Sequence, residues 1–192
     1  MPASRKPTIR RLTVYVCCAL VFLLARPTPL LFAVGATLCV LGELLRIWAC
    51  GHLRKNQAVI RSGPYSHVKN PLYLGTFLIL VGIVFAASDP DRGSPGRYLL
   101  ILFLPFALGV FFFYYLPHKF RVEAGRLRRR FGAEWDEYDR RVPDFLPSLL
   151  PRVSDPGRFD AGLVAENSEV GMALLVAIGL AAIACRFLPL PW

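Results

Sequence analysis

The segment from Ser62 to Gly75, with the sequence SGPYSHVKNPLYLG, combines residues that fix the backbone with residues able to contact a ligand. Glycine and proline punctuate such a loop and restrict its conformation. Asn70 followed by Pro71 predicts the N-cap and the first residue of a helix. Because the N–H groups at a helix start are free and lie at the positive end of the helix dipole, we expect this segment to hold an anionic group.

A second pair of ionisable residues, Glu43 and Arg46, lies near the end of an apolar run. Residues three apart share a helix face, so the two side chains are able to form an ion pair. Ionisable residues at membrane depth are functional candidates. The alternative is that Arg46 only extends its charged end to the membrane surface. The sequence leaves both interpretations open.

The cysteines and histidines show no pattern of metal ligands. The five cysteines lie in or at the ends of apolar runs without a CxxC pair, and the three histidines are scattered. Structural metal sites and disulfide frameworks have regular spacings. We therefore predict neither a metal site nor a disulfide framework.

The composition is that of a membrane protein. The 192 residues are 55% hydrophobic and 19% charged, with a mean hydropathy of +0.45. Long apolar runs separated by basic loops predict an all-α, polytopic helical membrane protein. The net charge is +10 and the pI about 9.8. Because the basic residues alternate with apolar runs, anionic lipid headgroups are the expected partner, and nucleic acid is not.

The apolar runs predict about five transmembrane helices, at residues 12–25, 30–49, 71–87, 98–116 and 170–188. The first run, with basic residues before it, resembles a secretory signal, but no small-residue cleavage site is apparent. A transmembrane helix is therefore favoured there. Residues 1–147 would form a membrane core, and residues 148–192 a linker and a C-terminal transmembrane helix.

The stretch 118–142 predicts a different kind of helix. Apolar residues recur there at spacings of three and four, while arginines enrich the polar surface. The apolar stripe consists of Leu127, Phe131, Trp135, Tyr138 and Val142. We expect an amphipathic helix along the cytoplasmic membrane surface, loosened or broken at Gly132.

The distribution of Lys and Arg predicts the orientation. With the N-terminus in the cytoplasm, nineteen of the 23 Lys and Arg residues fall on the cytoplasmic side of the five predicted spans. Cytoplasmic loops carry an excess of these residues. The segment from Ser62 to Gly75 and the amphipathic helix would then both face the cytoplasm, in a bacterial inner membrane.

Two motifs in this order resemble the isoprenylcysteine carboxyl methyltransferase family, which is related to the membrane phospholipid N-methyltransferases. The first is GPYxxVKNPLYLG, beginning at Gly63, and the second is ExxxLxxxFGxxWxxYxxxVPxFLP, beginning at Glu123. The similarity covers roughly residues 42–147. The resemblance implies an integral membrane enzyme, an S-adenosylmethionine-dependent methyltransferase, with the cofactor bound at the cytoplasmic side.

Carried over position by position, the resemblance implies cofactor contacts from both motifs. They are Tyr65, Val68, Lys69, Asn70, Pro71, Tyr73, Leu74, Glu123, Leu127 and Tyr138. Arg46 and Glu123 are the candidate catalytic residues. Glu123 would bind the cofactor's ammonium group, and Arg46 would anchor an anionic acceptor.

The chain departs from the family pattern at two positions. Asn70 stands where the family often has histidine, and Ala124 where it often has a second glutamate. An asparagine side chain forms hydrogen bonds but does not exchange a proton as histidine does. The departure at Ala124 bears on the substrate contact more than on the cofactor contact.

The leading hypothesis is therefore methyl transfer to a lipophilic acceptor, such as a prenylcysteine-type carboxylate, a phospholipid amine or a similar small molecule. The enzyme would align the acceptor with the activated methyl group and exclude water. The alternative is a non-catalytic membrane protein for binding or assembly that keeps the methyltransferase scaffold. A small transporter is a third hypothesis, which rests only on Glu43 and Arg46.

Overall fold

The computed structural model describes residues 6–54, 57–153, 155, 157–167 and 169–188, with the backbone alone described for residues 6–11. Within these residues the chain forms helices and no strands. The helices are α1 (Lys6–Leu24), α2 (Pro29–Cys50), α3 (Pro71–Ala87), α4 (Leu104–Gly109), α5 (Leu116–Phe131), α6 (Ala133–Arg141), α7 (Ala161–Glu166) and α8 (Glu169–Ala184). The predicted all-α class is confirmed.

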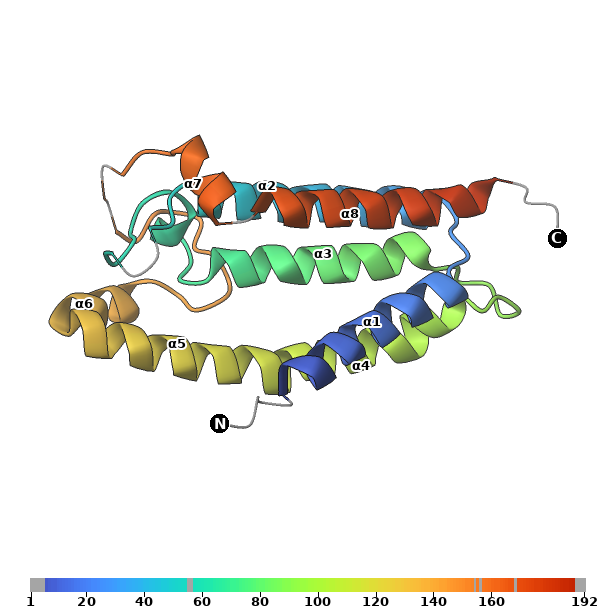
Figure 1. The fold of residues 1–192 in the computed structure, drawn as a ribbon, viewed down its shortest axis with the longest axis horizontal. Coiled ribbons are helices and arrows are strands. Elements are labelled where there is room, and N and C mark those ends of the chain that lie inside the picture. Colours follow the sequence, from blue (N-terminus) through green and yellow to red (C-terminus); the bar gives the residue numbers. More distant parts are fainter. Residues whose placement is uncertain (1–5, 55–56, 154, 156, 168, 189–192) are drawn as a thin grey trace.

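The helix α3 lies in the middle of a bundle, with α2 and α8 on one side and α1, α4 and α5 on the other (Figure 1). The helix α1 contacts α3 on the side away from α8. The loops after α2 and α6, together with α6 and α7, gather at one end of the bundle, which we call the α6 end (Figure 1). The segments that join α1 to α2 and α3 to the next helix lie at the opposite end.

Glycines allow α2 and α3 to approach closely. A Cβ atom at Gly42 would lie 2.7 Å from the carbonyl oxygen of Gly75, and one at Gly82 would lie 2.6 Å from that of Gly35. Small residues at such positions let transmembrane helices pack backbone against backbone. The contact between α2 and α3 is therefore the tightest constraint in the bundle.

The predicted fourth span and the start of the amphipathic helix form one continuous helix from Leu99 to Phe131. Pro105 and Pro117 lie within it, and each follows a π-helical turn, Leu99–Phe103 or Val110–Tyr115. Proline removes one backbone donor from a helix. The wider π-helical turns accommodate this loss locally, so the helix continues from the predicted fourth span into the amphipathic stretch without a break.

The amphipathic stretch breaks at Gly132, as the sequence predicted. Gly132 has φ +52°, a conformation in which a side chain is strained, and it separates α5 from α6. The apolar stripe predicted on one helix thus comes from two helices. Trp135, Tyr138 and Val142 pack around Val59 in a small core at the α6 end.

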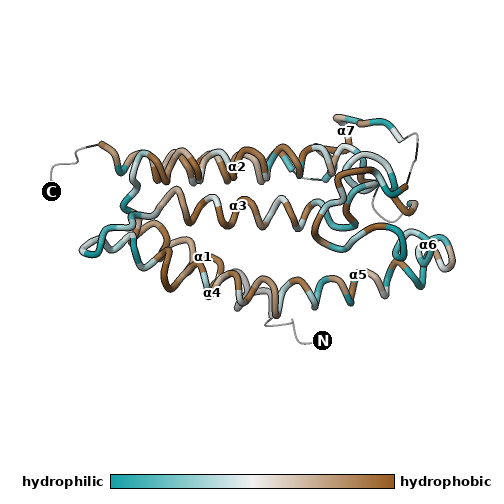
Figure 2. The backbone as a smooth tube through the Cα atoms, turned by 180° about the vertical axis from the view of Figure 1, so that it is seen from behind, coloured by the Kyte–Doolittle hydropathy of each residue, from teal (hydrophilic) through white to brown (hydrophobic). Residues whose placement is uncertain are grey.

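The described helices carry an apolar middle between polar ends (Figure 2). Three of them are long and apolar enough to cross a membrane: Pro29–Cys50, Leu99–Phe131 and Glu169–Phe187. Two shorter apolar helices, Leu12–Leu24 and Pro71–Ala87, accompany them. The structure thus supports a helical membrane protein with three candidate spans, fewer than the five expected.

Replacement of Gly35 by alanine tests the packing of α2 on α3. The new Cβ atom would overlap the backbone nitrogen of Ala86 and the carbonyl oxygen of Gly82, which are unable to move independently of α3. We expect Gly35→Ala to lower the stability by about 1–3 kcal/mol, as overpacking does. Thermal unfolding in detergent measures the change.

Gly109→Ala is the matched control, because a Cβ atom there meets nothing within 4 Å. Alanine at this helical position is expected to be neutral or to stabilise by about 0.5–1 kcal/mol. Equal unfolding temperatures for Gly35→Ala and Gly109→Ala would contradict the proposed role of the α2–α3 contact.

Candidate functional site

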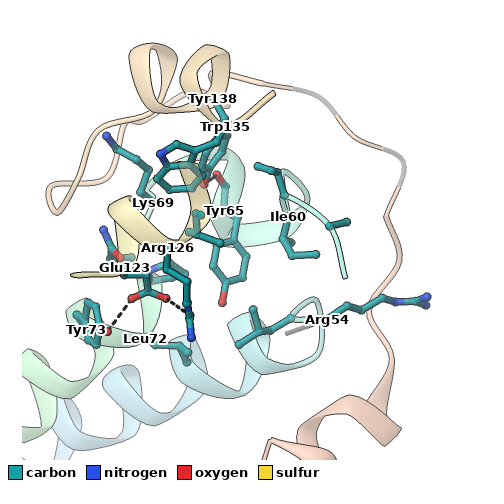
Figure 3. Close-up of a pocket in the computed structure, with 16 residues that line it drawn as sticks. Arg54, Ile60, Tyr65, Lys69, Leu72, Tyr73, Glu123, Arg126, Trp135 and Tyr138 are labelled. Carbon is teal, nitrogen blue, oxygen red and sulfur yellow. Dashed lines mark hydrogen bonds and ion pairs between the residues drawn. The ribbon is translucent and has the colours of Figure 1, made fainter. Parts of the chain in front are cut away.

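A cavity of about 320 Å³ opens at the α6 end, where α3, α5, α6 and the loop after α2 meet (Figure 3). Its volume falls in the range of small-molecule sites. The walls are mainly apolar, with Tyr65 and Glu123 among the polar groups. The remaining lining residues are Leu53, Arg54, Ala58, Val59, Ile60, Lys69, Asn70, Pro71, Leu72, Tyr73, Arg126, Leu127, Trp135 and Tyr138.

Backbone hydrogen bonds hold the two motif-bearing segments together around this cavity. The N–H of Lys69 donates to the carbonyl of Pro143 at 2.8 Å. The N–H groups of Ser148 and Arg152 donate to the carbonyls of His67 and Ser66 at 3.0 and 2.8 Å. These backbone hydrogen bonds therefore join residues 66–69 to residues 143–152, although the two segments are far apart in the sequence.

Asn70 and Pro71 begin α3, as predicted, but the Asn70 side chain does not cap the helix. Its amide instead donates to the carbonyl of Asp144 at 3.0 Å. Lys69 forms ion pairs with Asp139 and Asp144, both at 2.7 Å. Burial acts to lower the pKa of Lys69, but the two carboxylates outweigh it and raise that pKa. Both side chains thus tie α3 to the segment after α6.

Glu123 lies in the cavity wall and accepts a hydrogen bond from the Tyr73 hydroxyl at 2.8 Å. Its other oxygen lies 3.6 Å from Arg126, three residues later on α5. Figure 3 shows both interactions at one side of the cavity. This arrangement joins the first turn of α3 to α5. It also presents to the cavity a carboxylate whose charge is partly offset by Arg126.

Tyr65 presents a polar group without a partner. Its ring projects into the middle of the cavity (Figure 3), and within the described structure its buried hydroxyl has no hydrogen-bond partner. Burial, followed by nearby Cys50 and Tyr138, raises the pKa of Tyr65. The hydroxyl is therefore a neutral donor. An unsatisfied buried donor in a cavity is suited to a ligand that carries an acceptor.

Tyr138 acts as a structural residue. Its hydroxyl donates to the carbonyl of Tyr65 at 2.8 Å, and its side chain is almost fully buried. Burial raises the pKa of Tyr138, while Arg61 opposes that rise. Tyr138 thus fixes the backbone of Tyr65 and thereby the position of the free phenol.

The structure brings most of the predicted cofactor contacts to this cavity. Tyr65, Lys69, Asn70, Pro71, Tyr73, Glu123, Leu127 and Tyr138 all line it. Val68 and Leu74 do not: Val68 is buried, and Leu74 is half-buried one turn into α3. Sequence reasoning did not single out the apolar wall formed by Leu53, Ala58, Val59 and Ile60, because these residues carry no motif.

Arg46 also lies outside the cavity lining, and its expected pairing with Glu43 is replaced by another. Arg46 binds Glu169 of α8 through Nε at 2.5 Å and Nη2 at 2.9 Å. Its Nη1 donates to Thr76 at 2.6 Å. The Glu43–Arg46 pair that the sequence allowed is not formed, because Glu169, remote in sequence, offers both carboxylate oxygens to the guanidinium group.

Comparison with known proteins found two metal-resistance proteins. The chain is 30% identical over 150 residues to the nickel-cobalt-cadmium resistance protein NccN of Alcaligenes xylosoxydans xylosoxydans, covering 74% of this chain and 63% of NccN. It is 32% identical over 124 residues to the cobalt-zinc-cadmium resistance protein CzcN of Cupriavidus metallidurans, covering 64% of this chain and 51% of CzcN. The chain thus spans less than two thirds of either relative. No family model and no solved structure matches it.

These relatives correct the interpretation drawn from the two motifs. Both are named as metal-resistance proteins and neither as a methyltransferase. The assignment to isoprenylcysteine carboxyl methyltransferases, and with it methyl transfer as the function, is therefore wrong. The motifs identified residues that meet at one cavity, but a shared site does not fix the chemistry that it performs.

The described residues hold no group of three or more His, Cys, Asp and Glu side chains placed to bind a metal ion. The cavity itself contains one carboxylate, Glu123, and two arginines. Its donors and apolar walls are those of a site for an organic molecule with a polar end.

Removal of the Tyr65 hydroxyl should stabilise the ligand-free protein. Tyr65→Phe eliminates a buried donor without a partner, and we expect a gain of roughly 1 kcal/mol. Tyr138→Phe is the matched comparison, because it removes a hydroxyl that donates to a buried carbonyl. We expect it to cost about 1–3 kcal/mol. Thermal unfolding of both variants in detergent measures the difference, and destabilisation by Tyr65→Phe would show that its hydroxyl has a protein partner.

Proposed function

We propose that this protein is an integral membrane protein that contributes to resistance against divalent transition-metal ions. The observation that carries the proposal is the similarity to NccN and CzcN, whose names cover nickel, cobalt, cadmium and zinc. The three candidate spans support a location in the membrane. The metal ions are the stress that the protein counters.

The cavity at the α6 end is the proposed working site of the protein. It is large enough for a small organic molecule, its walls are mainly apolar, and Tyr65 offers a free donor at its centre. A molecule with an apolar body and a polar acceptor matches these groups. Binding of S-adenosylmethionine and catalysis of a reaction stay predictions for this site. A ligand-binding measurement tests the binding of S-adenosylmethionine.

For the topology we propose five spans, with the two shorter apolar helices crossing the membrane beside the three longer ones. The close packing of α3 against α2 supports this, because a helix packed along a transmembrane helix shares its depth. The α6 end would face the cytoplasm of a bacterial inner membrane. Basic residues of α5, α6 and the neighbouring loops gather at this end, which supports this orientation.

The resistance proposal is tested by growth in the presence of metal ions. Deletion of the gene should lower the concentrations of Ni²⁺, Co²⁺, Zn²⁺ or Cd²⁺ that inhibit growth, and the wild-type gene should restore them. Ala58→Trp places a large side chain in the cavity lining, so it should fail to restore resistance. Ala133→Trp is the matched control, because Ala133 is exposed at the start of α6 and lies outside the lining.

Immunoblots of membrane fractions establish that both variants accumulate equally. Resistance unchanged by the deletion would overturn the proposed function, and equal resistance of the two variants would overturn the role of the cavity. In parallel, S-adenosylmethionine added to purified protein should raise the unfolding temperature of the wild type and not of Ala58→Trp, because a ligand stabilises only the state that binds it.

The orientation is tested by accessibility of single cysteines in intact cells. A membrane-impermeant thiol reagent should label a cysteine introduced at Gly93, in the loop after α3, and should leave one at Leu149 unlabelled until the cells are opened. Both positions are exposed. The background carries Ala in place of all five native cysteines. The reverse labelling pattern would place the α6 end outside.

A further inference from the structure

A cluster of ionisable groups lies between α2, α3 and α8, and none of its residues is part of the cavity lining. It contains one guanidinium group, Arg46, and two carboxyl groups, Glu43 and Glu169. Glu43 lies two turns before the end of α2, or about 10 Å along the helix axis. Ionisable groups at such depth are expensive to bury and require either a partner or neutralisation.

The donors of Arg46 are directed to partners other than Glu43. Nε and Nη2 bind the two oxygens of Glu169. Nη1 donates to the Thr76 hydroxyl at 2.6 Å and to the Leu72 carbonyl at 3.3 Å. This bidentate geometry is typical of a guanidinium group bound to an ionised carboxylate. Glu169 therefore carries the negative charge that balances Arg46.

Glu43 is left without a hydrogen bond. Its side chain is 9% exposed, and within the described structure neither carboxyl oxygen has a hydrogen-bond partner or a measurable accessible area. The ion pairs of the described chain do not include it. Arg46 and Glu169 are the charged groups that act on it.

The charge balance decides which form of Glu43 the structure accommodates. With both carboxyl groups ionised, the cluster has a net charge of −1 in an apolar interior. With Glu43 protonated, the cluster is neutral, and the new hydroxyl group lies where it is able to donate to the Glu169 carboxylate. Burying an ionised carboxylate costs far more than burying a neutral polar group. The protonated form also removes the repulsion between Glu43 and Glu169.

We propose that Glu43 is an intramembrane proton-binding site, at which a proton from water forms an O–H bond with the carboxylate and is held beside the Arg46–Glu169 ion pair. The proton is the ligand of this site. The inference goes beyond the proposed role in metal resistance and does not depend on it.

The groups that face Glu43 are few. On α2 they are Cys39, one turn before it, and Arg46. On α8 the only ionisable side chain is Glu169, which also accepts from the Cys50 thiol at 3.5 Å. On α3, Ile79 lies beside Gly42 and Thr76 binds Arg46, and the only ionisable side chain of that helix, Tyr73, is bonded to Glu123. Among the described residues, Arg46 is therefore the one cation in position to compete with the proton.

The cluster also contacts the wall of the cavity. Arg46 donates to the carbonyl of Leu72, and Leu72 lines the cavity through its side chain. A change in the partners of Arg46 thus acts directly on the first turn of α3. This contact connects the proton site at Glu43 to the cavity through Arg46 and Leu72, although Glu43 itself does not line the cavity.

Infrared spectroscopy of the purified full chain in detergent tests the proposal. At neutral pH the wild type should show the carbonyl band of a protonated carboxylic acid, shifted by D₂O and by glutamate labelled with ¹³C at the side-chain carboxyl. Glu43→Gln should remove the band. Glu166→Gln is the matched control, because Glu166 is exposed on α7, and it should leave the band unchanged.

Two further variants test the competition for Arg46. In Glu169→Gln the guanidinium group loses its carboxylate, so Glu43, three residues earlier on the same helix, should ionise and pair with it. The acid band should then disappear although Glu43 is present. In Arg46→Gln both carboxyl groups lack a cation, and the band should grow.

Three results would overturn the proposal. They are a wild type without the acid band, a band that persists in Glu43→Gln, and a band that persists in Glu169→Gln. A shift of the carboxylate bands on addition of Ni²⁺, without any acid band, would assign the site to a metal cation instead. Because none of these measurements involves growth or resistance, their failure is distinguishable from failure of the proposed function.

Discussion

The close approach of α2 and α3 is the contact on which the other features of this protein depend. Four glycines, two on each helix, leave no room for a Cβ atom between the backbones. Inside a membrane there is no hydrophobic force to drive helices together, so this packing supplies the association energy. It fixes the depth of α3 relative to α2 and thereby places Thr76 and the Leu72 carbonyl within reach of Arg46.

The polar groups near the cavity and the Arg46 cluster are of two kinds, those with hydrogen-bond partners and those without. The hydrogen bonds around Lys69, Asn70 and Tyr138 are satisfied and join the loop before α3 to the segment after α6. The Tyr65 hydroxyl and the Glu43 carboxyl group are left without hydrogen bonds in the described structure. Arg61, Trp135 and Arg186 each also have a buried nitrogen without a partner there. Buried polar groups are normally paired, which is why we propose ligand binding at Tyr65 and proton binding at Glu43.

The two motifs located a site without determining its chemistry. Tyr65, Tyr73 and Glu123, which the motifs singled out, line one cavity. The relatives are metal-resistance proteins, which removes methyl transfer as the explanation for that set. A scaffold and its pocket persist more readily than a reaction, because the reaction depends on a few side chains within it.

The sequence by itself determined the helical class, the apolar stretches, the start of α3 at Asn70 and Pro71 and the break at Gly132. Each follows from local composition, periodicity or the backbone preferences of a single residue. The tertiary structure alone decided that Arg46 pairs with Glu169 and that Leu99–Phe131 is one helix. The ion pair depends on packing between two helices whose paired residues are 123 positions apart. The continuous helix depends on π-helical turns that offset two prolines. No local pattern encodes either of them.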